Sequence, residues 1–134
     1  MIGVGSLRDE LVKTPGVVVK DFMQPEQLKE EISKAGCLVL PSVKEPWGVI
    51  VHEASASGLP LLLSDVVGSC TAFLISGFNG YSFSVDSPVN LVQAMSKIIN
   101  HSDDELQKMS KTSYYLSNRI TPETSANNLY SIKK

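Results

Sequence analysis

The fold is decided by the stretch Pro41-Ser42-Val43-Lys44-Glu45-Pro46-Trp47-Gly48-Val49-Ile50-Val51-His52-Glu53-Ala54, which continues to Gly58-Leu59-Pro60 and Ser64-Asp65. Apolar runs at residues 37–40 and 61–63 flank a small, apolar segment at residues 48–57. Short apolar runs bounded by Pro and Gly are typical of buried parallel strands. Gly58 stands at the C-cap position of a helix over the segment between them, and Pro60 stops that helix. The stretch therefore predicts a strand, a loop, a helix and a strand, which together form a βαβ unit.

The charges of this stretch are unusual for a solvated helix. Glu53 is the only formal charge between Glu45 and Asp65, and no Lys or Arg occurs at residues 46–96. A helix face that is merely solvated carries several charges of mixed sign, which pair at i,i+4 spacing. Glu53 has no such partner in the sequence, so its carboxylate is a candidate for ligand binding.

The loop at residues 41–48 predicts a ligand-binding crevice. In doubly wound α/β folds, ligands bind outside the carboxyl ends of the strands, where this loop lies. We expect the free amides of Gly48, Val49 and Ile50 to bind a phosphate at the helix N-terminus. The carboxylates of Glu45 and Glu53 each accept hydrogen bonds from two neighbouring hydroxyls, which suits a ribose or a sugar ring.

These residues resemble the signature of the retaining glycosyltransferases of family four, which have the GT-B fold. The resemblance covers essentially the whole chain and rests on Pro41-Ser42, Glu45-x7-Glu53-Ala54, Gly48, Gly58-x-Pro60, Ser64-Asp65, Val67-Gly68 and Gly77-Phe78-Asn79-Gly80. It implies that Glu45 binds hydroxyls of the donor sugar and that Glu53 binds the ribose of the sugar nucleotide. It also implies that the backbone at Pro46, Trp47, Gly48, Val49 and Ile50 contacts the diphosphate and the sugar.

Two further residues are weaker candidates. Phe22 and Met23 follow a predicted buried strand at residues 17–19, and the resemblance places the corresponding loop close to the nucleotide base. Core packing is the alternative role for both side chains. The resemblance implies no cofactor and no metal: the donor's own phosphate assists the departure of the leaving group and takes the acceptor proton on the same face.

The resemblance implies an α/β fold with a Rossmann-like parallel sheet flanked by helices, which is the C-terminal half of a GT-B fold. Its strands run in the order 3-2-1-4-5-6, and residues 1–4 correspond to the second strand, so the central first strand is expected to be absent. The Gly-Arg turn and the downstream Lys that bind the diphosphate in the family have no counterpart here. Residues 1–134 are thus expected to form part of a nucleotide-sugar-binding domain, with the N-terminal acceptor domain missing from this chain.

Local signals predict the remaining elements. A helix is expected at residues 6–13, with Ser6 as its N-cap. Further helices are expected at residues 25–34, 89–100, 103–118 and 121–132, a late edge strand at residues 81–84, and a short helix or strand at residues 72–75.

The composition is that of one globular domain, with 134 residues, 43% hydrophobic and 19% charged. The net charge of −2 does not favour nucleic acid as a partner. The two cysteines are expected to be reduced thiols, which predicts a cytoplasmic location. The two histidines have no metal-ligand spacing with them, so no metal site is expected.

The predicted function is transfer of a sugar from a UDP- or GDP-sugar to an acceptor that the sequence does not name. Retention of configuration and a role in surface polysaccharide or other cell-envelope glycan synthesis are part of this prediction. Two alternatives stay open: a sugar-nucleotide-binding module without chemistry, and a GT-B nucleotide-sugar epimerase. The chain by itself is expected to be inactive, and a peripheral association of the longer protein with a membrane stays open as well.

Overall fold

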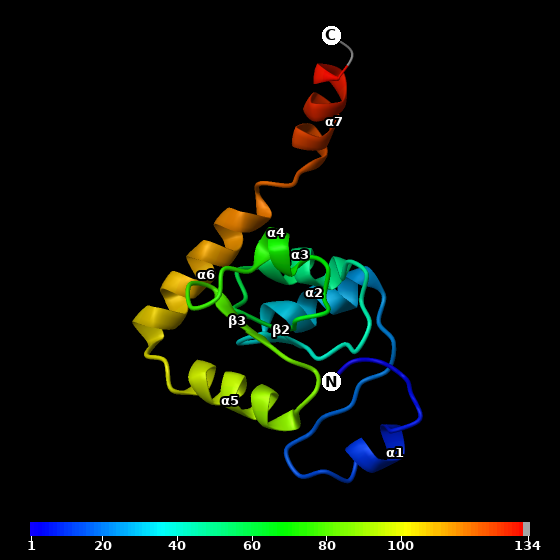
Figure 1. Cartoon of the computed structure of the whole chain (residues 1–134). Coiled ribbons are helices and arrows are strands. Elements are labelled where there is room, and N and C mark those ends of the chain that lie inside the picture. The colour runs from blue at the N-terminus through cyan, green and yellow to red at the C-terminus, as the bar shows by residue number, and fades with distance from the viewer. Residues whose placement is uncertain (133–134) are drawn as a thin grey trace. The chain divides into compact units, whose positions relative to one another are not determined.

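A computed structural model describes residues 1–132 of the chain (Figure 1). Its contacts divide it into two compact units, Met1–Lys34 and Ala35–Lys134. The second unit holds the predicted βαβ stretch and almost all of the buried apolar residues.

The second unit is built on a parallel sheet of three strands, in the order β1-β2-β3. The strands are β1 (Leu38–Leu40), β2 (Leu61–Ser64) and β3 (Gly80–Phe83). Leu38 lies opposite Leu61, and Leu61 lies opposite Gly80. β2 is the central strand of this sheet, and all four of its residues are buried. The parallel arrangement and the predicted strands at residues 37–40, 61–63 and 81–84 are thus confirmed, with shifts of one residue at some ends.

Within residues 35–132, this unit holds the helices α3 (Val49–Ala56), α4 (Cys70–Phe73), α5 (Pro88–Ile99), α6 (Asp103–Ser117) and α7 (Pro122–Ser131). Capping residues and glycines that the sequence predicts lie at the ends of several of these helices. Gly48 and Gly58 flank α3 with positive φ angles of 87° and 75°, a conformation that glycine adopts without steric cost. The Ser102 hydroxyl accepts a hydrogen bond from the Glu105 amide at the start of α6, and Thr121 caps α7 in the same way. α7 continues beyond α6 (Figure 1) and has no buried residue.

The core of the second unit lies between the sheet and its helices. One buried cluster joins Leu62 and Phe83 of the sheet to Ala94 and Ile98 of α5 and Met109 of α6. α3 packs against α6, and α5 packs against β3.

The buried side chain of Asn79 fastens the connection between α4 and β3. Its Nδ2 donates to the carbonyl of Phe73 (2.8 Å) and to Ser113 Oγ on α6 (3.1 Å), and its Oδ1 accepts from the amide of Ile75 (2.7 Å). This one side chain satisfies three polar groups and ties the loop to α6.

The first unit holds α1 (Arg8–Leu11) and α2 (Pro25–Ser33). The prediction of α2 is confirmed to within one residue. The prediction of a helix over residues 6–13 capped by Ser6 is wrong: α1 is one turn long, and its N-cap is Leu7, without a side-chain hydrogen bond.

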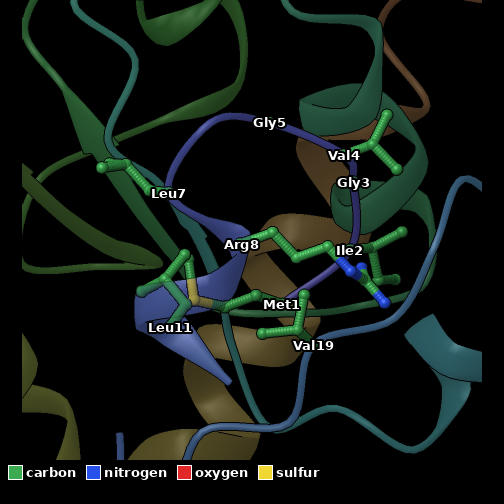
Figure 2. A pocket seen from close by; sticks show the side chains of 9 residues that line it. All are labelled: Met1, Ile2, Gly3, Val4, Gly5, Leu7, Arg8, Leu11 and Val19. Carbon is green, nitrogen blue, oxygen red and sulfur yellow. The ribbon is translucent and has the colours of Figure 1, made fainter. Parts of the chain in front are cut away.

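The predicted buried strand at residues 17–19 is also wrong. Val18 is 64% exposed, and the only pairing nearby is an isolated parallel bridge between Ile2 and Lys20. Two short segments cannot sustain a ladder without a third strand and an apolar face to bury. The side chains around this bridge instead border a cavity of about 230 Å³, lined by Met1, Ile2, Gly3, Val4, Gly5, Leu7, Arg8, Leu11 and Val19 (Figure 2).

Candidate functional site

The candidate site is formed by two loops that leave neighbouring strands at their carboxyl ends. The β1–α3 loop (residues 41–48) follows β1, and the β2–α4 loop (residues 65–69) follows β2. The two loops pair with each other through a parallel bridge between Glu45 and Val67. The Gly68 amide donates to the carbonyl of Glu45, and the Ser69 amide donates to the carbonyl of Trp47, each at 3.0 Å. The strands and these bonds together fix the backbone that leads into α3.

The β1–α3 loop presents unpaired amides at the start of α3, as the sequence predicts. Within residues 1–132, the amides of Gly48, Val49 and Ile50 have no hydrogen-bond partner. The left-handed conformation of Gly48 turns the chain directly into the helix. Val49 is 65% exposed, so the positive end of the α3 dipole faces solvent and is open to an anion.

Glu45 lies half-buried in the same loop. Its Oε1 accepts a weak hydrogen bond from the amide of Trp47, at 3.3 Å. Its second oxygen has no partner in the described part of the chain, so the carboxylate retains capacity to accept hydrogen bonds from ligand hydroxyls.

Glu53 lies on the exposed face of α3. This face repeats at i and i+4, so Glu53 shares it with Val49, whereas Val51 and Ala54 are buried. No basic side chain in residues 1–132 pairs with Glu53: the ion pairs found there involve other carboxylates. The carboxylate is therefore exposed, unpaired and one turn away from the free amides.

The aromatic residues of the stretch have mainly structural contacts. The Trp47 ring packs edge-on against Phe73, with ring centroids 6.2 Å apart, and its remaining surface is exposed, as is that of Pro46. His52 stacks on the same Phe73 ring at 4.7 Å, and its Nε2 lies 3.1 Å from the carbonyl of Ser117. His52 thus joins α3 to the end of α6.

Cys70, which begins α4 beside the site, is not an activated thiol. Burial and, to a lesser extent, the charge of Asp65 raise the pKa of the Cys70 thiol. Because the thiolate is the nucleophilic form, this cysteine stays protonated and unreactive at neutral pH.

Phe22 and Met23 lie outside the unit that holds this site. Both belong to the first unit, where Phe22 is exposed and Met23 half-buried. Buried core packing, the alternative for these two residues, is wrong for Phe22. Base contacts by these residues stay a prediction.

Gly68 and Ser69 are the residues of this site whose role sequence reasoning missed. Gly68 is among the residues on which the family resemblance rests, but the sequence predicts no role for it or for Ser69, and their bonds to the β1–α3 loop span about twenty residues of chain. The available signal was Gly68 itself, because a close approach of another backbone segment often requires a residue without a side chain.

Comparison of the fold with known structures defines its class. The chain superposes on sucrose-phosphate synthase from Thermosynechococcus elongatus with a TM-score of 0.80 and 23% identity, covering 95% of this chain and 32% of that one. It superposes on the pneumococcal O-GlcNAc transferase GtfA, solved with UDP and GlcNAc, with a TM-score of 0.74 and 21% identity, covering 94% of this chain and 26% of that one. The α/β fold, with its small parallel sheet flanked by helices, is that of the C-terminal domain of GT-B glycosyltransferases, as predicted.

The family follows from the sequence match. Residues 6–115 match the glycosyl transferases group 1 family, and the chain belongs to it. A glycosyltransferase of Methanocaldococcus jannaschii, itself uncharacterised, is 36% identical over 73 residues, which is 49% of this chain and 19% of that protein. The chain thus spans about a third or less of the proteins named here. No helix within residues 1–132 has the length and apolar character needed to cross a lipid bilayer.

Proposed function

We propose that this chain is the donor-binding part of a retaining glycosyltransferase of family four. Residues 1–134 are, in this proposal, part of the C-terminal nucleotide-sugar-binding domain of a GT-B enzyme. The observation that carries the proposal is the geometry at the start of α3. Three amides without a hydrogen-bond partner among the described residues lie there, and an exposed, unpaired Glu53 lies one turn along the helix.

Each part of a nucleotide-diphosphate sugar has a matching group in this proposal. The amides of Gly48, Val49 and Ile50 bind the diphosphate, Glu53 binds the ribose, and Glu45 binds hydroxyls of the donor sugar. Pro46 and Trp47 border the sugar. The protein then contributes by orienting the donor, while the donor's phosphate takes the acceptor proton on the face from which the nucleotide leaves.

The donor is proposed to be a UDP- or GDP-sugar, and the product a cell-envelope glycan made in the cytoplasm. UDP is the nucleotide bound in the pneumococcal neighbour. Because the chain spans a third or less of the structures it matches, we expect this chain alone to bind the donor without transferring the sugar. Transfer from a labelled UDP- or GDP-sugar to any acceptor by the purified chain would contradict that expectation.

The assignment of the two carboxylates is tested by titrating UDP, GDP and a UDP-sugar by calorimetry. Glu53→Ala is expected to weaken the binding of the bare nucleotide by about 1.5–3 kcal/mol, the cost of a lost charged hydrogen bond. This corresponds to a roughly 10- to 150-fold increase in Kd. Glu45→Ala is expected to weaken the binding of the UDP-sugar and to leave the binding of UDP and GDP unchanged. Glu30→Ala, an exposed glutamate on α2, is the control and should change neither.

Two results would contradict this assignment. If Glu45→Ala weakens the bare nucleotide as much as Glu53→Ala does, the roles of the two carboxylates are wrong. If the unmodified chain binds neither UDP nor GDP at millimolar concentration, the proposed function itself is wrong.

A further inference from the structure

We propose that Gly68 is a positioning residue for the donor site. Its lack of a side chain lets the β2–α4 loop lie against the β1–α3 loop and hold the free amides of α3 in place. This inference rests on the proposed function for its ligand. Its structural part, that Gly68 sets the conformation of the β1–α3 loop, stands on contacts within the chain.

The two loops are too close at Gly68 for any other residue. A Cβ built there would lie 1.9 Å from the carbonyl oxygen of Pro46 and 2.9 Å from its carbonyl carbon. Both are backbone atoms, so no rotation of a side chain relieves the overlap. The backbone conformation of Gly68 itself is not left-handed, so the close approach alone demands glycine here.

The β1–α3 loop is the side that must move when this space is filled. The β2–α4 loop is fixed by its neighbours, because Val67 is 2% exposed and Ser69 is fully buried. Pro46 and Trp47 on the other side are exposed. A side chain at residue 68 therefore displaces the carbonyl of Pro46, two residues before Gly48, and weakens the bonds from Gly68 to Glu45 and from Ser69 to Trp47.

Gly48 transmits this displacement to the amides. Its α-carbon is enclosed by Glu45 and Val67, whose side-chain carbons would lie 3.3 and 3.4 Å from an added Cβ. Because Glu45 and Val67 face each other across the paired loops, separating the loops changes the surroundings of Gly48 from both sides. The orientation of the amides of Gly48, Val49 and Ile50 then changes.

The test compares Gly68→Ala with Gly36→Ala in the full chain. Gly36 is the matched control, because an added Cβ there meets nothing within 4 Å and its φ is not left-handed. Two measurements need no ligand: the fluorescence emission of Trp47, the only tryptophan, and the amide NMR shifts of Gly48, Val49 and Ile50. A third is the affinity for UDP and GDP.

Gly68→Ala is expected to change the Trp47 emission and the three amide shifts while the far-UV circular dichroism stays unchanged. The affinity of this variant for UDP and GDP is expected to fall about tenfold or more, because the amides that bind the diphosphate in the proposed function are displaced. Gly36→Ala is expected to match the unmodified chain in all three measurements.

Three outcomes decide the matter. If Gly68→Ala leaves the Trp47 emission and the amide shifts unchanged, the inference is wrong, whether or not nucleotide binds. If these change but the unmodified chain binds no nucleotide, the proposed function fails and the positioning of the loop stands. If Gly68→Ala does not fold, Val67→Ala takes its place: Val67 is bridged to Glu45 of the other loop and its Cγ1 lies beside Gly48, so a smaller change of the same kind is expected and its absence contradicts the inference.

Discussion

Gly80 has no room for a side chain, because a Cβ there would lie 1.8 Å from the carbonyl oxygen of Leu61 on the neighbouring strand. We expect Gly80→Ala to lower the free energy of unfolding by about 3 kcal/mol, since β3 must move away from β2. Gly77→Ala is the control. Gly77 has a φ of +84° but nothing within 4 Å, so only backbone strain of about 1 kcal/mol is expected there. Urea denaturation of both variants checks this, and equal losses would contradict it.

Glu105 makes the stability of the chain depend on acid pH. Its carboxylate accepts hydrogen bonds from the amide and hydroxyl of Ser102, which, with a contribution from His101, lower its pKa from 4.5 to about 2. A carboxyl group whose pKa is lower in the folded state than in the unfolded state stabilises the fold at pH values above its unfolded pKa. This stabilisation is lost as the pH falls through the folded pKa. The stabilisation is therefore present above about pH 4.5 and disappears towards pH 2.

We accordingly expect Glu105→Gln to be less stable than the unmodified chain at pH 6, and the difference to shrink as the pH falls from 4.5 to 2. Urea denaturation at several pH values measures it. Asp104→Asn removes a charge from the same first turn of α6 but no hydrogen bond to Ser102, and it is the control for the loss of charge alone. A difference that stays constant over this range would show that Ser102 does not stabilise the ionised carboxylate.

The connection between α4 and β3 depends on the buried amide of Asn79. Asn79→Ala leaves the carbonyl of Phe73 and the amide of Ile75 without their partner. An unsatisfied buried group costs about 1–3 kcal/mol, so we expect a loss of about 3 kcal/mol. Ser113→Ala removes only the bond to Asn79 Nδ2 and should cost about 1 kcal/mol.

A double-mutant cycle over Asn79 and Ser113 separates the two contributions. Because they share a hydrogen bond, the combined loss should be smaller than the sum of the single losses. Strict additivity in urea denaturation would show that the bond between them contributes nothing.

The elements that the sequence predicts well are those with local signals. Gly48 and Gly58 bound α3, Ser102 caps α6, and an uninterrupted apolar run marks β2. Each of these signals lies within a few residues of the element it defines, so no knowledge of the rest of the fold is needed. The lack of a basic partner for Glu53 was predictable in the same way, from the absence of Lys and Arg around it.

The parts that the sequence predicts poorly depend on distant partners. Val17, Val18 and Val19 have the composition of a buried strand, but only the isolated bridge at Lys20 pairs near them, and composition cannot reveal a missing partner. The pairing of Glu45 with Val67 depends on two loops meeting in space. Apart from the glycine at residue 68, nothing local to either loop indicates this pairing, so the contacts of Gly68 emerge only from the structure.

At the scale of the whole molecule, apolar burial differs greatly between the two units. In Met1–Lys34 the buried apolar core is Ile32 alone, at 9% exposure, and α1 has no buried residue. In Ala35–Lys134 the three leucines of β2 are fully buried among residues of several helices. Since burial of apolar surface is the main stabilising term, we expect the two units to open with different free energies.

Hydrogen exchange of the backbone amides measures this difference. Residues 1–24 are expected to exchange fast, and β2 slowest, because local opening needs less free energy where little apolar surface is buried. A matched pair of core truncations tests whether the units open independently. Leu62→Ala, in the buried cluster with Met109, should cost about 2–5 kcal/mol and lower protection throughout the second unit, while leaving the first unit unchanged. Ile32→Ala should do the reverse. Equal protection in both units, or a loss of protection in both from either truncation, would show that the chain unfolds as one cooperative body.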